Sequence, residues 1–260
     1  MRVTILTDNI AGEEFEAEHG LSYLIENDGH SVLLDTGHSD VFLKNARQLG
    51  IDLHKQVETV VLSHGHWDHG NGLKFFSGKK LVAHPAVFSK RFRKSDHGYL
   101  GLDTGRAEIE KNYSIHTSKK PIQLTPNLWF LGEVPRLNDF EGQHTNYVLD
   151  SGEDDFIVDD SALAAVVNDE LVVISGCAHS GICNICEYAK KVTGVSKIKS
   201  VIGGFHLKDK GEQTQNTLNY FSENNIETLL PAHCTAAPAK SLFRTRFQFP
   251  DVKTGMVFTF

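Results

Sequence analysis

Four potential metal ligands lie within six residues of this sequence, in the segment SHGHWDHG at residues 63–70. The segment follows residues 57–62, a short run rich in β-branched side chains that predicts a buried strand ending in a loop. In extended chain, residues two apart point to the same side, so His64 and His66 can place two imidazoles on one ion. Imidazole and carboxylate ligands without thiolate favour zinc, and they also suit iron, manganese or cobalt.

Asp68 and His69 cannot easily join the same ion. Neighbouring residues on a turn or helix diverge by roughly 100°, which suits a second ion a few ångströms from the first. The spacing therefore predicts a binuclear centre. Two divalent cations that share a water molecule lower its pKa and present hydroxide as a nucleophile, with Asp68 as a metal ligand that also steers this hydroxide. We therefore predict a hydrolase with Asp68 as its catalytic residue.

A histidine-rich loop can also be an exposed loop without function, but this segment in addition matches a family signature. The pattern His-x-His-x-Asp-His after a strand resembles the signature of the metallo-β-lactamase superfamily. Residues 31–37 resemble that family's strand-Asp-Thr-Gly element, which implies that Asp35 hydrogen-bonds to a ligand histidine and orients it. The strand-like residues 171–181 and 229–234 deliver His179 and His233, which match the family's third ligand of the first metal and the last ligand of the second.

The sequence departs from the family pattern in residues 201–207, VIGGFHL. Most members carry an aspartate here that bridges both ions. This chain has none at that place, although Asp209 follows the apolar run. We expect His206 to serve as a ligand of the second ion, and we expect that ion to bind more weakly or to be a different metal.

At finer grain, residues 19–22, 132–136, 159–163, 175–184 and 203–207 resemble one branch of the superfamily, the dihydropteroate-synthase-like, dihydropterin-related proteins. Some of them are called 7,8-dihydropterin-6-methyl-4-(β-D-ribofuranosyl)aminobenzene 5'-phosphate synthases. The branch implies an alternative function, a transferase that condenses a dihydropterin pyrophosphate with an aminobenzene-ribofuranosyl phosphate. There the metal would hold the pyrophosphate leaving group while the arylamine attacks.

Two other classes fit less well. A metal-binding protein without turnover needs only one closed site, whereas Asp35 and the two-ion spacing point to a water-accessible centre. Oxidoreductases of the flavodiiron type use a glutamate where this chain has His66, and no flavin domain is evident.

Length and composition predict one domain over residues 1–260, because 260 residues of which 40% are hydrophobic can fill one large core. Strand-like runs alternate with helical stretches at residues 41–49, 184–193 and 214–224. This pattern predicts an α/β fold with two sheets covered by helices. The resemblance implies the four-layer αββα sandwich of the metallo-β-lactamase type.

No apolar stretch approaches the 18 or so residues that a membrane span needs, and residues 1–8 do not resemble a signal peptide, so we expect a cytoplasmic protein. The formal charge of −7 argues against nucleic acid as a partner and leaves a small molecule as the expected substrate. The four cysteines, Cys177, Cys183, Cys186 and Cys234, lie in or near the histidine motifs and are expected to be reduced thiols. Cys177 and Cys234 flank His179 and His233, so they are candidates for a role close to the metal.

One basic strip, residues 90–94, interrupts the acidic composition. Arg91 and Arg93 could grip a phosphate or carboxylate of the substrate, because guanidinium binds such groups bidentately. The competing interpretation is a solvated helix face. Arg136 and Glu141, in a loop-like segment, are further candidates for substrate contact.

Overall fold

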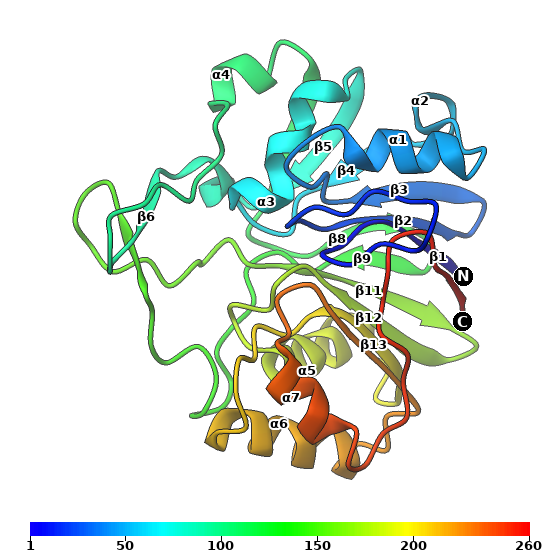
Figure 1. The fold of residues 1–260 in the computed structure, drawn as a ribbon, viewed down its shortest axis with the longest axis vertical. Helices are drawn as coiled ribbons and strands as arrows, with labels where there is room; N and C mark the ends of the chain where they lie inside the picture. The colour runs from blue at the N-terminus through cyan, green and yellow to red at the C-terminus, as the bar shows by residue number, and fades with distance from the viewer.

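Two β-sheets pack face to face between two layers of helices in the computed structural model, which describes residues 1–260 (Figure 1). The predicted four-layer αββα sandwich is confirmed. The first sheet has the order β15 (Val257–Thr259), β1 (Arg2–Thr7), β2 (Ser22–Asn27), β3 (His30–Leu34), β4 (Thr59–Val61), β5 (Lys79–Ala83) and β7 (Tyr113–Thr117). The second has the order β14 (Thr228–Ala232), β13 (Ile198–Gly204), β12 (Glu170–Ser175), β11 (Ala162–Val167), β9 (Leu128–Phe130) and β8 (Ile122–Thr125). A small antiparallel ribbon pairs β6 (Arg91–Arg93) with β10 (Tyr147–Leu149).

The helices divide between the two outer faces (Figure 1). The first sheet is covered by α1 (Val41–Gln48), α2 (Leu53–Gln56), α3 (Trp67–Gly70) and α4 (Arg106–Ile109), with the 3-10 helices η1 (Asn71–Phe75) and η2 (Pro85–Phe88) nearby. The second sheet is covered by α5 (Ile182–Thr193), α6 (Glu212–Glu223) and α7 (Ala237–Phe243). The three predicted helices correspond to α1, α5 and α6, and no helix is long and apolar enough to cross a bilayer.

Alternation along the strands builds a separate core on each side of a sheet. On β12, Val172 and Ile174 face the first sheet, whereas Leu171 and Val173 face the helix α5. All four side chains are fully buried, and each contributes about 1.5–3 kcal/mol relative to an exposed position. The hydrophobic effect thus holds the two sheets together and fixes which strand residues can reach the sheet edge.

Parallel strands explain why distant segments meet at one edge. In the first sheet β3, β4, β5 and β7 run parallel, and in the second β12, β13 and β14 do. The carboxyl ends of parallel strands share an edge, where α/β proteins commonly place their sites. Asp35 follows β3, His64 follows β4, His179 follows β12, His206 follows β13 and His233 follows β14.

Glycine is required between the first two histidines of the motif. A Cβ on Gly65 would collide with the backbone carbonyl of Val87, and the Gly65 amide donates a 2.7 Å hydrogen bond to the Asp159 carboxylate. We expect Gly65→Ala to lower the free energy of unfolding in urea by about 1–3 kcal/mol, because overpacking forces the backbone apart. Gly105→Ala, with open space around its Cβ, is the control and should change stability by less than about 0.5 kcal/mol. Equal effects of the two substitutions would contradict this account.

Candidate metal centre

Several residues at the shared sheet edge have a left-handed backbone. Asp35, His206 and His233 have φ angles of 57°, 52° and 45°, and Ala178, immediately before His179, has 51°. Non-glycine residues in this region cost about 1–3 kcal/mol each and persist where the surrounding structure holds them, commonly at functional sites. Four of the ten non-glycine residues with a positive φ thus lie in the loops of this edge, next to or among the candidate ligands.

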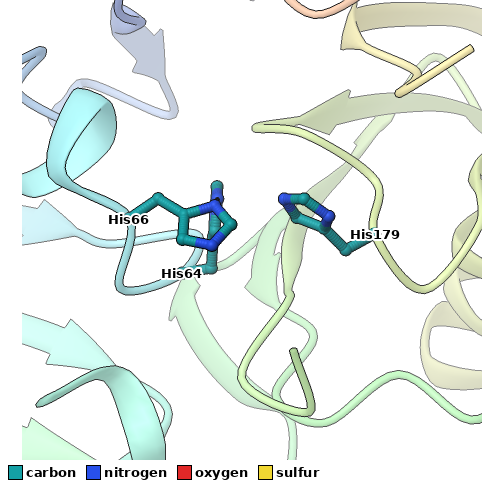
Figure 2. A group of neighbouring side chains, drawn as sticks. All are labelled: His64, His66 and His179. Carbon is teal, nitrogen blue, oxygen red and sulfur yellow. Dashed lines mark hydrogen bonds between the residues drawn. The ribbon is translucent and has the colours of Figure 1, made fainter. Parts of the chain in front are cut away.

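The first group of candidate ligands is formed by His64, His66 and His179, whose rings point toward one another from two different loops (Figure 2). The Nε2 atom of His64 lies 2.9 Å from Nδ1 of His66, and one ligand atom from each of the three residues lies within 4.8 Å of the others. The Ser63 hydroxyl donates to Asp35 Oδ2 at 2.7 Å, so it accepts at 2.9 Å from the His64 Nδ1–H. This arrangement leaves the lone pair of His64 Nε2 free for an ion.

The second group is formed by Asp68, His69 and His233. Nε2 of His69 lies 3.1 Å from Nε2 of His233, and Oδ2 of Asp68 lies 3.4 Å from Nε2 of His233. The opposite nitrogen of each ring has its own partner. Asp35 Oδ2 is 2.7 Å from His69 Nδ1, and Asn9 Oδ1 is 3.0 Å from His233 Nδ1. Both Nε2 atoms are therefore directed into the site.

The protonation states of these groups suit metal binding. Burial lowers the pKa values of His64, His66 and His179 well below the usual range, and neighbouring positive groups lower them further. Burial raises the pKa of Asp68, but His69, His19 and His233 outweigh burial and hold this pKa well below its usual value. Neutral imidazoles and an ionised carboxylate are the forms that bind metal ions.

His233 differs from the other histidines. Burial lowers its pKa, but the hydrogen bond with Asp68 and the nearby negative charges raise it more, to about 9. In the protein without metal, this raised pKa favours a protonated His233 that pairs with the ionised Asp68. A divalent cation placed among the same atoms would replace this proton.

His206 lies beside the first group and outside the second. Its ring centroid is 4.2 Å from that of His179, and its Nε2 atom is 3.5 Å from the Tyr147 hydroxyl. It falls in a third group of possible ligands, with Cys177 and Cys234. Buried nitrogens of three site histidines have no hydrogen-bond partner: Nε2 of His66, Nε2 of His179 and Nδ1 of His206. Unpaired buried nitrogens are costly, so a donor set of this kind fits bound cations.

A cavity of about 520 Å³ opens above these groups. The candidate ligands His66, Asp68, His179, His206 and His233 all line it. Around them the wall contains the flat side chains of Trp67 and Tyr147 and the cations of Arg93 and Lys208. A smaller cavity of about 270 Å³ adjoins it and shares Tyr147, His179, His206 and Lys208.

Arg91 and Glu141 have structural partners, and their interpretation as substrate contacts is corrected. Arg91 is 1% exposed and forms ion pairs with Asp159 at 2.8 Å and Asp155 at 3.3 Å. Glu141 is fully buried and accepts hydrogen bonds from the backbone amides of Cys183 and Asn184 in the first turn of α5. Arg91 stands in a basic strip and Glu141 in a loop-like segment, and the partners of both lie more than forty residues away in the chain.

Of the other two candidate arginines, Arg93 lines the large cavity and Arg136 does not. Arg93 is on the short strand β6, not on a helix face, and it lines the large cavity while pairing with Asp96 at 2.7 Å. Arg136 donates hydrogen bonds to the backbone carbonyls of Phe156 and Val134, and does not line either cavity.

Several site residues were not identified from the sequence. Asn9, Tyr147 and Lys208 carry no local pattern that marks them as part of a site. Ser63 does have a signal in the sequence, because it directly precedes the first histidine of the motif. His19, which lies 3.2 Å from Asp68 Oδ2, stands in a segment whose sequence resembles the branch described above.

Comparisons with known proteins agree with this geometry. Residues 16–190 match the family model of the metallo-beta-lactamase superfamily. The chain is 30% identical over 290 aligned positions, covering 100% of this chain and 97% of the relative, to a 7,8-dihydropterin-6-methyl-4-(beta-D-ribofuranosyl)-aminobenzene-5'-phosphate synthase of Methanocaldococcus jannaschii. It is 32% identical over 245 residues, 91% of each chain, to an uncharacterised protein of the same organism. The crystal structure of Tm1679, a metal-dependent hydrolase of the beta-lactamase superfamily, has a TM-score of 0.88 at 32% identity and covers 100% of this chain and 99% of that one.

Removing the Asp35 carboxylate should weaken metal binding, because Asp35 orients both Ser63 and His69. We expect Asp35→Asn to lower the affinity for zinc by about 10–100-fold in a chelator competition titration. Asp169→Asn, at an exposed turn far from the site, should leave the affinity unchanged. Affinities within twofold of each other, with both variants folded by circular dichroism, would contradict the orienting role.

Asp160 supports the His179 loop through hydrogen bonds from the Ser180 amide and hydroxyl at 2.8 and 2.5 Å. Burial raises the pKa of Asp160 from 3.8 to about 6, although the Ser180 bonds lower it. Between these pH values the folded protein binds more protons than the unfolded chain, so this group stabilises the fold below pH 3.8 and the stabilisation is lost as the pH rises through about 6.

We therefore expect Asp160→Asn, which cannot ionise, to gain stability relative to the wild type as the pH rises from 4 to 7, by up to about 3 kcal/mol. Urea unfolding at both pH values, with Asp139→Asn as an exposed control, measures this difference. A difference between Asp160→Asn and the wild type that does not change with pH would contradict the raised pKa.

Proposed function

The chain belongs to the metallo-β-lactamase superfamily, and we propose that it is a metal-dependent hydrolase that acts on a small anionic substrate at a binuclear centre. The observation that carries this proposal is the presence of two separate ligand groups, His64–His66–His179 and Asp68–His69–His233, beside one cavity. Support for hydrolysis comes from the similarity to Tm1679, a metal-dependent hydrolase.

The residues of the chain have distinct roles in this proposal. When bound, two divalent cations, zinc or else iron, manganese or cobalt, lower the pKa of a water molecule and polarise the scissile bond. Asp68 orients the attacking water through Oδ2, an atom that lies 3.2 Å from His19 Nε2 and is held in place by it. Asp35 and Asn9 fix the rings of His69 and His233 from behind.

The cavity wall supports an anionic substrate. Arg93 and Lys208 place two cations on the wall beside the ligand groups, and such side chains bind phosphate or carboxylate. Trp67 and Tyr147 offer flat apolar surfaces to the remainder of a small molecule.

A transferase is the second candidate, and two observations favour it. The relative with 30% identity over the whole chain is called a dihydropterin aminobenzene phosphate synthase. In addition, two adjoining cavities share Tyr147, His179, His206 and Lys208, an arrangement with room for two reactants on either side of one wall. In this candidate the cations would hold a pyrophosphate leaving group.

The test compares two sets of substrates with the metal-loaded protein. For the hydrolase we expect turnover of phosphodiester, thioester or lactone probes, and a loss of at least about 100-fold in kcat/KM for His64→Ala and Asp68→Ala, because each removes a ligand. His30→Ala, an exposed histidine at the start of β3, should retain full activity.

The transferase would instead release pyrophosphate only when the dihydropterin pyrophosphate and the arylamine are both present. That result, without turnover of any hydrolase probe, would replace the first candidate with the second. A metal content of one equivalent or less in the active protein would contradict the binuclear centre itself.

A further inference from the structure

Cys177 lies two residues before His179, at the carboxyl end of β12. Its sulfur belongs to two groups of possible ligands, one with His64 and His69 and one with His206 and Cys234. His64 is a member of the first proposed metal group and His69 of the second. The Cys177 thiol therefore lies between the two groups.

The distance from the Cys177 sulfur to the candidate ligand His69 is close to that expected between two ligands of one ion. The Sγ atom of Cys177 is 3.3 Å from Nε2 of His69, the ring nitrogen that faces the site. Two ligands of one tetrahedral zinc ion lie about 3.5 Å apart, because the Zn–N bond is about 2.0 Å and the Zn–S bond about 2.3 Å. The separation of 3.1 Å between the Nε2 atoms of His69 and His233 belongs to the same range.

The surroundings of Cys177 differ from those of the cysteines in the core. Cys183 and Cys186 on α5 belong to the hydrophobic cluster between the second sheet and its helices, and Cys177 does not. Cys177 is 4% exposed and lines the large cavity together with His66, whose buried Nε2 has no partner. Its surroundings are those of a site residue, because the neighbours of its sulfur are nitrogen and sulfur ligands.

Glycine at the end of β13 leaves room for the backbone of Cys177 and the sulfur of Cys234. Where the superfamily resemblance leads one to expect an aspartate, this chain has Gly203 and Gly204 at the end of β13. A Cβ on Gly204 would approach the Cys177 Cα to 3.3 Å and the Cys234 sulfur to 2.5 Å. The missing side chain thus allows the two cysteines to approach this end of the strand.

From these contacts we propose that Cys177 is a thiolate ligand shared between the two metal groups, in place of the bridging carboxylate that this chain lacks. The inference rests on the binuclear centre of the proposed function. A sulfur ligand makes the centre softer, so it should prefer zinc, cadmium or cobalt to manganese.

Two spectroscopic measurements test the inference on the full-length protein. For the zinc-loaded wild type, X-ray absorption should show a sulfur neighbour at about 2.3 Å. The cobalt-loaded wild type should show a sulfur-to-cobalt charge-transfer band in the near ultraviolet. Both signals should disappear in Cys177→Ala and remain in Cys234→Ala and in Cys186→Ala, the matched control from the α5 core. The affinity of Cys177→Ala for cadmium should fall by at least about tenfold.

The outcomes separate this inference from the proposed function. A wild type that binds two ions through nitrogen and oxygen alone would overturn the sulfur ligand and leave the hydrolase proposal standing. Loss of the sulfur signal in Cys234→Ala, with the signal intact in Cys177→Ala, would also overturn it. A wild type that binds no ion overturns both. If Cys177→Ala fails to fold, a sulfur signal that persists in Cys234→Ala still assigns the ligand to Cys177, the other cysteine on the cavity wall.

Discussion

The buried carboxyl group of Asp35 is the constraint on which the site depends. One side chain accepts from the Ser63 amide and hydroxyl and pairs with His69 Nδ1, each at 2.7 Å. Through Ser63 it fixes the ring of His64, a candidate ligand of the first ion, and directly it fixes His69, a candidate ligand of the second. Asp35 is fully buried, so these hydrogen bonds are required to compensate for its lost hydration. The two metal groups therefore share one orienting residue.

The second sheet must come close to this network without disturbing it. Gly176, at the end of β12, makes the approach possible, because a Cβ there would collide with the Ser63 hydroxyl and lie 3.0 Å from Asp35 Oδ2. The Ser63 carbonyl in turn accepts from the Ser161 amide, just before β11. Packing of the apolar strand faces brings the two sheets together. The close approach at Gly176 and the hydrogen bond between Ser161 and Ser63 then fix how the loops of the two sheets meet.

Those parts of the candidate site that are local in the sequence could be predicted from it, whereas contacts between distant residues could not. His64, His66, Asp68 and His69 stand within six residues, so period and ligand chemistry were enough to place them at the end of a strand. The αββα layering followed from alternating strand and helix patterns and from the family resemblance, and it is confirmed. Arg91 was misjudged because Asp155 and Asp159 lie more than sixty residues downstream. An even longer separation hides Asn9, because its partner His233 is 224 residues away.

The charge of the centre connects the ligands to the proposed substrate class. Among the six residues of the two metal groups Asp68 is the one carboxylate, and its pKa is held well below the usual value. The lowered pKa values of His64, His66 and His179 keep these three rings neutral rather than positive. Two divalent cations would leave the centre with a net positive charge even with one thiolate added. The nearby Lys208 increases that charge, whereas the guanidinium of Arg93 pairs with Asp96 at 2.7 Å. A phosphate, pyrophosphate or carboxylate would compensate this positive charge, and this supports the anionic substrate of the proposed function.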